Sequence, residues 1–526
     1  MFFSIENNAR LEWRGPIWWD RAVRETKSKN ISFTGANPTS SASPRLVPGI
    51  AKRVHLLGAG GAGMSAIWQL LRARGHDVSG HDPMPSAFVT ALESSGVQVV
   101  SGDSTPNHFP SDAQTLIRSA AVPDTDPQML AAEAAGIPVM SYKHALGALT
   151  ANNALAVAGT HGKTSTTWML FEALSGLDQA RSEVGLPMQG AGALVGGLHQ
   201  GLNCNVVVPK EGAPIAVEAC EYDRTFLELS PRGGIVTNLE PDHLDYYGSM
   251  QALEDAFARF ADRIHPEGLL VLSSGAPEFL RDAAPCEVWS RGREYDVELH
   301  GEDRGHFLIR VVGPGWASGV VRLQVPGEFN VDNAGAAVAL AVGLNARGDS
   351  PLDPQMVAEH AARGVARYQG TKRRFEHWGE VKGVKVVHDY AHHPTEVRVT
   401  LEAARRVFPG LPLHVFFQPH QASRTQRFLG DFIESLRGAD RVVVADVYGA
   451  RHSIDGRVAG AEDLVAGLRR AGLDAEAGGG LKTSLEETVQ GLLDIQGPVA
   501  LLVLGAGDID STHDDLTNQL ALRRDS

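Results

Sequence analysis

Short apolar segments alternate with amphipathic ones along most of the chain, and glycine-rich turns join many of them. An apolar run at 54–57 is followed by a glycine turn, by residues of helical periodicity at 64–75, and by a second strand-like run at 77–82. The same succession begins again at 154–159 and at 385–390. Parallel strands need a crossover segment between them, so these repeated units predict an α/β protein with parallel sheets.

The remaining elements are predicted from the same two periods. Strands are expected at 115–121, 137–141, 214–220, 233–239, 268–274, 413–417, 441–447 and 499–504. Helices are expected from Thr164 onward and at 331–346, 354–363, 395–407 and 424–437. Between 295 and 325 apolar and polar residues alternate in short segments, which predicts an antiparallel addition to the second block.

These patterns divide the chain into an extension and three blocks. We expect a flexible N-terminal extension at 1–50, because residues 26–50 contain eight Ser or Thr and three prolines and show no hydrophobic period. Acidic residues near the start argue against a targeting peptide. The three α/β blocks are expected at 51–149, 150–364 and 365–526.

The composition narrows the range of functions. Hydrophobic residues make up 43% and charged residues 21% of the 526, a balance typical of folded globular proteins. The net charge of −14 argues against binding to nucleic acid or to an anionic membrane surface. Three cysteines are too few for a disulfide framework and indicate a reducing compartment such as the cytoplasm. The sequence leaves the oligomeric state open.

The first glycine turn has the spacing of a dinucleotide-binding loop. Gly58, Gly60, Gly61 and Gly63 lie between a strand and a helix, and Asp82 ends the next strand. Such a turn holds a diphosphate with backbone N–H groups at the N-terminus of the helix. The motif does not separate NAD from a UDP-sugar, and a tight turn without a ligand is the alternative.

The second glycine turn, at 159–164, reads GTHGKT and is a shortened phosphate-binding loop. In the full motif the first glycine would occupy position 157, which is Val157 here. The functional parts remain: an apolar strand before the turn, Lys163 to contact phosphates, Thr164 to bind Mg²⁺, and a helix behind. We therefore expect ATP or GTP to bind at this turn.

Two acidic clusters, at 218–223 and 240–245, follow apolar strands of the same block. The carboxyl ends of parallel strands meet at one edge of a sheet, so both clusters are expected near the phosphates, where carboxylates suit Mg²⁺. His243 is either a metal ligand or a helix-capping residue. Cys220 lies between acids, which disfavour a thiolate, so we expect it to serve in packing.

Strand ends in the third block carry basic residues and histidines. A Lys-Arg-Arg run at 372–374 precedes a strand that contains Asp389 and is followed by two adjacent histidines. Adjacent histidine side chains point apart, so this pair does not predict a zinc site. His420 and Arg424 follow the next strand, where an arginine can clamp a phosphate or a carboxylate.

The order of the motifs resembles that of the Mur ligase superfamily. The motifs that carry the resemblance are GAGGAGMS, GTHGKTSTT, EACEYDRTFL, VTNLEPDHLDYYG, FNVDNA, KRRFE, DYAHHPTEV and FQPH. They extend from about Val54 to Asp508, and their order and spacing together are highly specific. The resemblance implies three domains: a UDP-binding Rossmann-like domain, a central P-loop ATPase domain, and a C-terminal Rossmann-like domain that closes over the nucleotide.

The resemblance also implies an activity and a set of site residues. It implies an ATP- and Mg²⁺-dependent ligase that joins L-alanine to the carboxylate of UDP-N-acetylmuramate through an acyl phosphate, in the synthesis of peptidoglycan precursors. The implied catalytic residues are Lys163, Glu218, His243, Arg374 and Asp389, and the implied metal ligands are Thr164, Glu218 and His243. The implied ATP-binding residues are Gly159, Thr160, His161, Gly162, Lys163, Thr164, Ser165, Asn330, Asn333, Arg374 and Asp389. The implied substrate-binding residues are Gly58, Gly60, Gly61, Gly63, Asp82, Tyr390, His392, His420 and Arg424.

Two departures from the family pattern lie in the third block. The family commonly has Asp-Asp-Tyr-Gly before the paired histidines, where residues 388–391 read His-Asp-Tyr-Ala here, and Asp389 is the retained acid. The family commonly reads Pro-His-Arg where this chain has Gln421 in place of the arginine. The change removes one presumed contact to the muramyl substrate, for which Arg424 can compensate.

Three alternatives stay open at this point. A recycling ligase that attaches a preformed tripeptide to UDP-N-acetylmuramate shares most of the motifs. Outside the family, an NAD-dependent dehydrogenase or a non-catalytic nucleotide-binding protein could carry the first glycine turn. A dehydrogenase has no need of the second loop, and a non-catalytic relative should have lost Lys163, Glu218 or His243. His392 and His420 are both candidates for the base that takes a proton from the amine.

Overall fold

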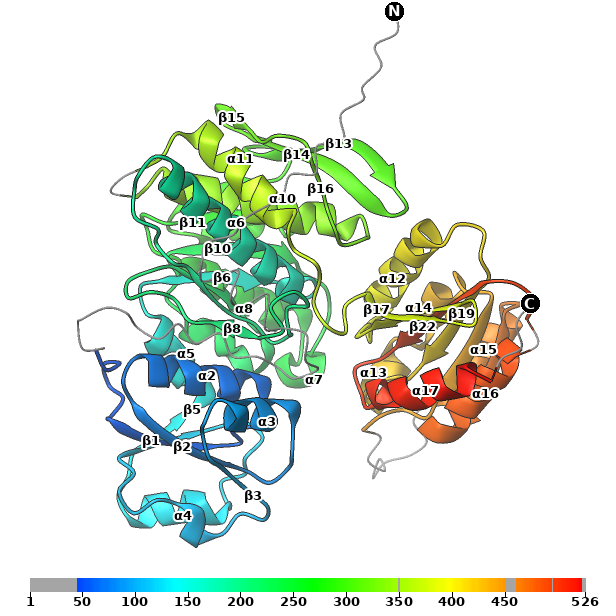
Figure 1. The fold of residues 1–526 in the computed structure, drawn as a ribbon, viewed down its shortest axis with the longest axis horizontal. Coiled ribbons are helices and arrows are strands. Elements are labelled where there is room, and N and C mark those ends of the chain that lie inside the picture. The colour runs from blue at the N-terminus through cyan, green and yellow to red at the C-terminus, as the bar shows by residue number, and fades with distance from the viewer. Residues whose placement is uncertain (1–44, 349–350, 450–459, 494, 523–526) are drawn as a thin grey trace, which may run out of the picture.

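The computed structural model describes residues 45–348, 351–449, 460–493 and 495–522. Most of the predicted extension, residues 1–44, lies outside these described residues. Figure 1 shows three α/β units in chain order. The blue and cyan N-terminal unit lies below the green central unit, and the yellow to red C-terminal unit lies to their right. The predicted succession of strand–helix–strand blocks is therefore confirmed.

The N-terminal unit is a five-stranded parallel sheet with the strand order β3-β2-β1-β4-β5. Its elements are β1 (Arg53–Leu57), α2 (Ala62–Ala73), β2 (Asp77–Asp82), α3 (Ala87–Ser94), β3 (Val99–Ser101), η1 (Pro106–His108), β4 (Thr115–Arg118), α4 (Pro127–Ala134), β5 (Val139–Ser141) and α5 (Tyr142–Thr150). Strands β2 and β3 are added on one side of β1, and β4 and β5 on the other. The glycine turn after β1 therefore lies at the topological switch point, where such sheets bind ligands. Val47 and Ile50 are buried in the core of this unit, so packing against it begins before residue 51.

The central unit contains a seven-stranded sheet with the order β12-β11-β10-β6-β9-β7-β8, in which only β8 runs antiparallel to its neighbour. Its strands are β6 (Ala154–Ala158), β7 (Gly192–Leu194), β8 (Val206–Val207), β9 (Ile215–Glu218), β10 (Gly233–Asn238), β11 (Leu269–Gly275) and β12 (Glu287–Ser290). Its helices are α6 (Lys163–Glu183), η2 (Tyr222–Glu228), α7 (Leu244–Tyr247), α8 (Met250–Asp262), α9 (Phe279–Ala283), α10 (Phe329–Asn345) and α11 (Pro354–Val365).

Alternate residues of strand β6 belong to two different hydrophobic cores. Leu155 and Val157 pack with helices α6, α10 and α11 on one face of the sheet. Ala154 and Ala156 pack on the opposite face, in a core that helix α8 shares with the N-terminal unit. Because both faces are covered, the strand reads as a continuous apolar run, as buried parallel strands do. The N-terminal unit is thus joined to the central unit through a shared apolar core.

An antiparallel sheet follows the central sheet and confirms the prediction for 295–325. It consists of β13 (Asp296–Asp303), β14 (His306–Gly313), β15 (Trp316–Ala317) and β16 (Val321–Arg322), with β14 paired to the other three. Buried residues of β14 alternate with half-buried ones, and the buried set (Phe307, Ile309 and Val311) packs with helix α10 within the first central core. The sheet therefore covers this helix rather than extending the parallel sheet.

The C-terminal unit is a six-stranded sheet with the order β17-β18-β22-β19-β20-β21, parallel except for the edge strand β17. Its strands are β17 (Glu376–Val381), β18 (Val384–Asp389), β19 (Leu413–Phe417), β20 (Arg441–Ala445), β21 (Asp474–Gly479) and β22 (Val499–Leu504). Its helices are α12 (Pro394–Val407), α13 (Ala422–Arg427), α14 (Leu429–Leu436), α15 (Ala461–Arg470), α16 (Leu481–Leu493), η3 (Ile509–Thr512) and α17 (His513–Leu520).

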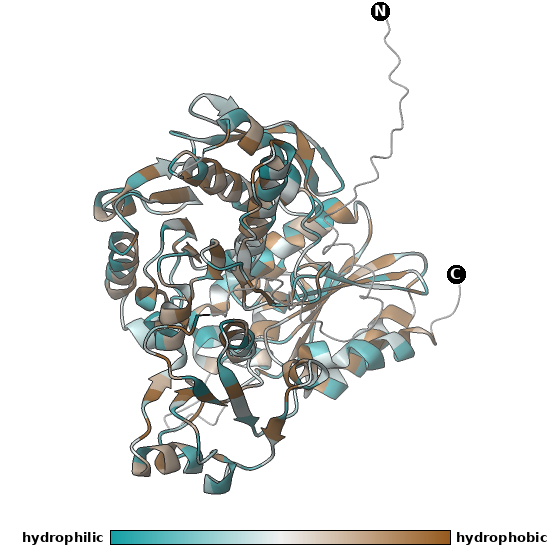
Figure 2. Cartoon of the chain, turned by 60° about the vertical axis from the view of Figure 1, so that its left-hand side comes forward, coloured by the Kyte–Doolittle hydropathy of each residue, from teal (hydrophilic) through white to brown (hydrophobic). Residues whose placement is uncertain are grey.

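The single helix predicted at 424–437 is wrong, because the structure has two helices that meet at Phe428. This residue has φ −104° and ψ 22°, outside the helical region, and its ring packs edge-on against His393 at 4.9 Å. The tertiary contact competes with the helical propensity of the segment. Helices on the surface show both colours in Figure 2, as amphipathic helices do. In the described ranges we find no helix with the length and apolarity needed to cross a membrane.

Candidate active site

The central glycine turn joins the end of β6 to the start of α6. Gly159 and Gly162 have φ values of 137° and 81°, which glycine adopts without strain. A Cβ on Gly159 would collide with the hydroxyl of Thr237 at the end of β10. Thr237 Oγ1 donates to the carbonyl of His161 (2.6 Å), and the His161 N–H donates to Asn238 Oδ1 (2.8 Å). The neighbouring strand β10 therefore holds the shortened turn in shape at the N-terminus of α6.

Lys163 lies in the turn and makes an ion pair with Glu221. Its Nζ is 2.9 Å from Glu221 Oε2 and donates to the carbonyls of Gly159 (2.6 Å) and Thr160 (3.0 Å). Burial opposes the charge, but the nearby Glu221 carboxylate more than offsets it and raises the pKa of Lys163. Lys163 is therefore a fixed, buried cation at the point where the phosphates of a nucleotide would lie.

Next to Lys163, Thr164 and Glu218 form a pair of oxygen groups of the kind that bind a metal ion. Thr164 Oγ1 donates to Glu218 Oε1 at 2.7 Å, and the Gly196 N–H donates to Glu218 Oε2 at 2.6 Å. The sequence places Glu218 at the end of β9, next to β6 in the sheet, which explains why two segments 54 positions apart meet here. A hydroxyl and a carboxylate are hard oxygen donors, as Mg²⁺ prefers.

His243 lies on the other side of Glu221. Its Nε2 is 4.0 Å from Glu221 Oε1 and 3.6 Å from Asp242 Oδ2. It occupies the N-cap position of α7, but its side chain makes no capping hydrogen bond, so the capping interpretation is not supported. Burial lowers the pKa of His243 and keeps the ring neutral, as a metal ligand requires. Burial likewise raises the pKa of Cys220 to about 12, in line with the predicted lack of a thiolate.

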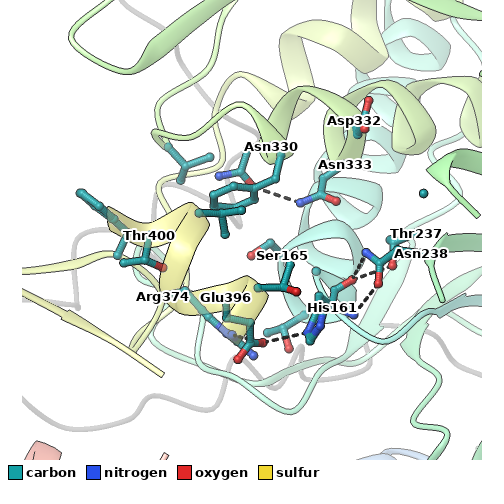
Figure 3. Close-up of a pocket in the computed structure, with 18 of the residues that line it drawn as sticks. His161, Ser165, Thr237, Asn238, Asn330, Asp332, Asn333, Arg374, Glu396 and Thr400 are labelled. Atoms are coloured by element: carbon teal, nitrogen blue, oxygen red, sulfur yellow. Dashed lines mark hydrogen bonds and ion pairs between the residues drawn. The ribbon is translucent and has the colours of Figure 1, made fainter. Parts of the chain in front are cut away.

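A cavity of about 200 Å³ opens beside the turn, between the central and C-terminal units (Figure 3). Eight of the predicted ATP-binding residues line it: His161, Gly162, Thr164, Ser165, Asn330, Asn333, Arg374 and Asp389. Gly159, Thr160 and Lys163 belong to the turn but not to this lining. Residues from both units thus enclose one cavity next to a phosphate-binding turn.

Asn330 and Asn333 lie on the first turns of α10 and line the cavity, with the Asn333 side chain next to Gly162 of the glycine turn. Asn330 Nδ2 donates to the carbonyl of Pro326 (2.7 Å), and Asn333 Nδ2 donates to Asn330 Oδ1 (3.1 Å). The ring of Phe329 lines the same cavity and is 38% exposed. A flat aromatic face next to fixed amides is a suitable surface for a nucleotide base.

The C-terminal unit contributes Arg374 and Asp389 to the cavity. Asp389 accepts hydrogen bonds from the N–H groups of Phe375 (2.7 Å) and Ala391 (2.8 Å), and burial raises its pKa to about 6. Arg374 Nη1 lies 3.4 Å from Glu396 Oε1. Asp389 therefore shapes the backbone on both sides of the strand end, while Arg374 presents a cation to the cavity.

Three of the predicted substrate-binding residues of the C-terminal unit, Tyr390, His392 and His420, have rings that contact one another in sequence. The guanidinium of Arg374 lies 5.2 Å from the Tyr390 ring centre. The His392 ring lies edge-on to both Tyr390 (5.2 Å) and His420 (5.9 Å), and His420 stacks on Tyr448. Burial, with His392 nearby, lowers the pKa of His420 to about 4. His420 Nδ1 is buried and has no hydrogen-bond partner in the described parts of the chain.

Arg424 makes a buried ion pair with the central unit. Its Nη2 lies 2.7 Å from Asp242 Oδ1, and both side chains are less than 10% exposed. Burial opposes the charge of Asp242, but Arg424 and the neighbouring His243 hold its pKa well below the usual range. The structure thus engages Arg424 with Asp242, next to the histidine of the proposed metal set.

The N-terminal glycine turn lies against the central acidic cluster. Gly58 takes a φ of 76°, and the Gly60 N–H donates to Asp82 Oδ2 at 2.8 Å, so Asp82 fixes the turn itself. Gly61 caps helix α2, and Gly63 leaves room for the ring of Tyr142. The half-buried Tyr142 lies near Cys220 and Glu218 of the central acidic cluster, and Glu218 in turn accepts a hydrogen bond from Thr164 of the central turn.

Five residues near these sites were not assigned by sequence analysis: Tyr142, Glu221, Asp242, Glu240 and Glu396. The four acids belong to motifs quoted above, so their place in those motifs was the available signal. Tyr142 has no such signal. The acids matter because they pair with the cations of the site, which the motifs alone do not reveal.

A further group of donors spans the two units: atoms of His161, Glu240 and His393 lie within 4.8 Å of one another. Burial opposes a charge on His161, but hydrogen bonds to Glu240 and Glu396 raise its pKa to about 9. The proton bound by His161 therefore supplies the positive charge between these two carboxylates. The group of His161, Glu240 and His393 thus shares no residue with the Thr164–Glu218 pair.

Three family models match successive parts of the chain. The model of the "Mur ligase family, catalytic domain" matches residues 53–154, the "Mur ligase middle domain" matches 157–341, and the "Mur ligase, glutamate ligase domain" matches 373–507. Together they span the three α/β units described above.

Several relatives match most of the chain. The UDP-N-acetylmuramate–L-alanine ligase of Kineococcus radiotolerans is 42% identical over 92% of this chain and 99% of its own. That of Saccharopolyspora erythraea is 38% identical over 88% and 92%. Among solved structures, the UDP-N-acetylmuramate-alanine ligase of Thermotoga maritima has a TM-score of 0.71 and 25% identity, covering 89% of this chain and 98% of its own. A murein peptide ligase from Psychrobacter arcticus has a TM-score of 0.63 at 22% identity, covering 90% and 99%, which shows the fold alone.

Proposed function

The chain belongs to the Mur ligase family, and we propose that it is an ATP-dependent ligase that joins L-alanine to the carboxylate of UDP-N-acetylmuramate. The product is a precursor of peptidoglycan. One observation carries the proposal from the structure. The diphosphate-type turn contacts Tyr142 at Gly63, Tyr142 lies near Glu218, and Glu218 accepts a hydrogen bond from Thr164 in the ATP-type turn. Sites for two phosphate-bearing substrates therefore lie next to each other in one chain.

The three units would divide the work along the predicted boundaries. Residues 51–149 would hold the UDP part, because their glycine turn lies at the switch point of a parallel sheet. Residues 150–364 would bind ATP, and residues 365–526 would close the cavity from the other side. The few cysteines support a cytoplasmic location, and the partners would be the small-molecule substrates.

In the first step an oxygen of the lactyl carboxylate attacks the γ-phosphorus of ATP, and ADP leaves. Lys163 is placed to stabilise the transferring phosphoryl group, because it is fixed by two carbonyls and Glu221. Thr164, Glu218 and the neutral His243 fit Mg²⁺ by their donor chemistry, and the ion would neutralise charge on the phosphates. Arg374 would approach the phosphates from the C-terminal unit.

In the second step the neutral amine of L-alanine attacks the acyl carbon, and phosphate leaves through a tetrahedral intermediate. The amine loses a proton, for which His392 and His420 were both candidates. His392 Nδ1 is engaged by the Tyr390 carbonyl (2.9 Å) and by Glu396 (3.2 Å), whereas His420 Nδ1 is free of partners among the described residues. Because Nδ1 of each ring is engaged or buried, Nε2 is the nitrogen that would take the proton in either residue, and both histidines stay candidates for the base.

Release of phosphate from ATP tests the proposal. The purified protein is mixed with ATP, Mg²⁺ and UDP-N-acetylmuramate, and candidate amines are added in turn. We expect release with L-alanine, weaker release with glycine and L-serine, since one methylene changes affinity by only ~1–3 kcal/mol, and no release without the UDP-sugar. Release with a preformed tripeptide but not with L-alanine would identify the recycling ligase instead. Turnover of NADH without phosphate release would reject the ligase altogether.

A further inference from the structure

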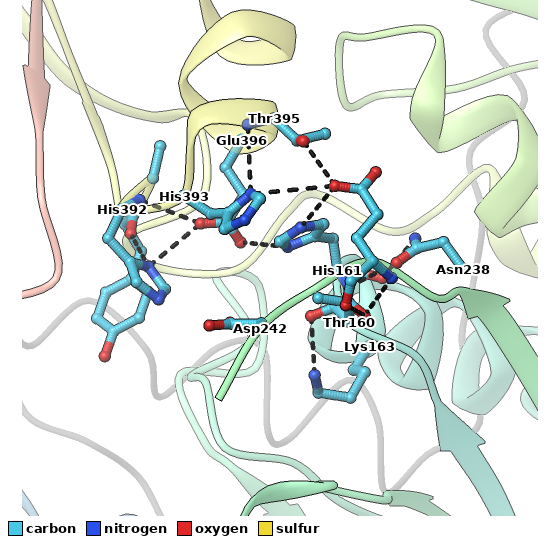
Figure 4. Close-up of polar contacts among 12 residues, drawn as sticks. Thr160, His161, Lys163, Asn238, Asp242, His392, His393, Thr395 and Glu396 are labelled. Carbon is cyan, nitrogen blue, oxygen red and sulfur yellow. Dashed lines mark hydrogen bonds and ion pairs between the residues drawn. The ribbon is translucent and has the colours of Figure 1, made fainter. Parts of the chain in front are cut away.

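The first turn of helix α12 docks on the central glycine turn through a closed set of polar contacts (Figure 4). Glu396 Oε1 lies 3.3 Å from His161 Nδ1, and Thr395 Oγ1 donates to Glu240 Oε2 at 2.6 Å. His161 Nε2 lies 3.5 Å from the same Glu240 oxygen. Two residues of the C-terminal unit and two of the central unit therefore form one ring of contacts. We call His161, Glu240, Thr395 and Glu396 the α12 clasp.

Glu396 gathers cations and donors from three segments of the chain. Besides His161, its carboxylate lies 3.4 Å from Arg374 Nη1 and accepts the N–H of His392 at 3.1 Å. It is the third residue of α12, where the helix dipole favours a negative charge. Burial opposes this charge, but His392 and His161 hold the pKa of Glu396 well below its usual range. The carboxylate is ionised and fully engaged.

The three partners of Glu396 belong to three different parts of the site, which must lie close together for the reaction. His161 belongs to the phosphate-binding turn, Arg374 lines the nucleotide cavity, and the ring of His392 lies edge-on to that of His420, the other candidate base. Arg374 and His392 belong to the same unit as Glu396, so its contact with His161 is the one that ties this carboxylate to the phosphate-binding turn. One side chain therefore couples the relative position of three functional groups.

We propose that Glu396 is a positioning residue, which sets Arg374 and His392 relative to the phosphate-binding turn by sharing its carboxylate with His161. The assignment rests on the function proposed above. Glu396 does not touch the reacting atoms; it acts through the groups that it holds. Thr395 and Glu240 form the second bridge of the α12 clasp and fix the same helix turn without contacting Arg374.

The test compares two variants on the same helix. Glu396→Gln keeps the shape but removes the charge, and we expect kcat/KM for ATP to fall by ~10- to 100-fold, the range for a buried hydrogen bond to a charged group. Glu402→Gln is the matched control, because Glu402 is 59% exposed and, within the described part of the chain, forms an ion pair with Arg398 alone, one turn away. Equal rates in the two variants would overturn the proposal.

A pH profile separates positioning from a general loss of structure. The charged groups that face His161 are Glu240 and Glu396, and the adjacent His393 is neutral because burial lowers its pKa to about 4. In the wild type His161 keeps its proton up to about pH 9. In Glu396→Gln one carboxylate is gone, so the proton is lost at lower pH and the alkaline limb of the rate profile moves toward neutrality. Thr395→Val should lower the rate without moving this limb. An unmoved limb in Glu396→Gln would overturn the proposal.

Two further measurements keep the result interpretable. If Glu396→Gln does not fold, Thr395→Val and His161→Gln probe the same ring, and we expect their losses in kcat/KM to be non-additive when combined. Additive losses would overturn the proposal. The affinity for ATP without acceptor or amine should also fall in Glu396→Gln relative to Glu402→Gln. That binding experiment tests the role of Glu396 independently of the substrates. If the wild type releases no phosphate with L-alanine, only the proposed substrates are refuted.

Discussion

Replacing Lys163 should affect stability and catalysis in ways that a second substitution can separate. Lys163→Met removes the only cation within 3.0 Å of Glu221 that the described contacts include, and the Glu221 side chain is 3% exposed. Removing one partner of a buried pair typically costs ~3–5 kcal/mol, because the other charge stays buried. We therefore expect a lower midpoint of urea unfolding for the variant without nucleotide.

The double variant Lys163→Met/Glu221→Gln removes both charges of the pair. Its unfolding midpoint should return most of the way to the wild-type value, because a neutral amide is far less costly to bury than an unpaired carboxylate. Its rate should not return. Loss of one preplaced stabiliser of the transferring phosphoryl group costs at least ~10²-fold in kcat, and Glu221→Gln restores no positive charge.

The assay measures phosphate release at saturating ATP, together with urea unfolding followed by fluorescence. Glu221→Gln alone is the control, since it keeps Lys163 while changing the same contact. The reasoning is refuted if the double variant regains wild-type turnover, because Lys163 would then have no role in phosphoryl transfer. An unchanged unfolding midpoint for Lys163→Met alone would show that the ion pair does not stabilise the fold.

Three further substitutions test other parts of the site. Gly60→Ala places a Cβ 2.9 Å from Asp82 Oδ2 and so disturbs the N-terminal glycine turn. The KM for the UDP-sugar should rise about tenfold (~1.4 kcal/mol), while the KM for ATP stays constant. Equal changes in both KM values would contradict a separate UDP site. Glu218→Gln should need ~10- to 100-fold more Mg²⁺ for half-maximal rate, and an unchanged Mg²⁺ titration would exclude it as a ligand. Asp242→Asn should lower stability at pH 7. The lowered pKa of Asp242 contributes stability that is fully present above its unfolded pKa of ~3.9 and is lost as pH falls from there toward the lowered folded pKa. The difference from wild type should therefore persist down to about pH 4 and shrink below it, and a difference that stays constant below pH 4 would argue against the Arg424 pair.

Long elements with a clear period could be predicted from sequence, and short ones could not. Strand β6 is a continuous apolar run, and β1 and β19 are mostly apolar, because parallel sheets bury both faces; the predicted ranges overlap the observed ones closely. Strands β7 and β8 have three and two residues, too few for any period to appear. They exist because β9 offers a free edge for β7 to pair with, which is a tertiary cause.

The same distinction holds within the site. The turn at 159–164 could be identified because its parts are contiguous, and backbone geometry follows from the local sequence. The partner of Lys163 could not, because the sequence offers many acids and states no distances; Glu221 is selected by the pairing of β6 with β9. The role of Glu396 was missed for the same reason, since His161 lies 235 positions away.

The two outer units are attached to the central unit by different kinds of contact, and this difference bears on how substrates enter. The N-terminal unit shares a continuous apolar core with the central sheet, from Val47 to Val288. In the described residues, the two cores of the C-terminal unit contain no central residue, and the contacts across that boundary include Arg424–Asp242 and the α12 clasp. Separating an apolar core costs ~25 cal/mol for each Å² exposed, whereas polar groups that part regain hydrogen bonds from water. We therefore propose that the C-terminal unit is the one that opens to admit ATP, and that its closure would bring Arg374 and Glu396 to the turn and exclude water from the acyl phosphate.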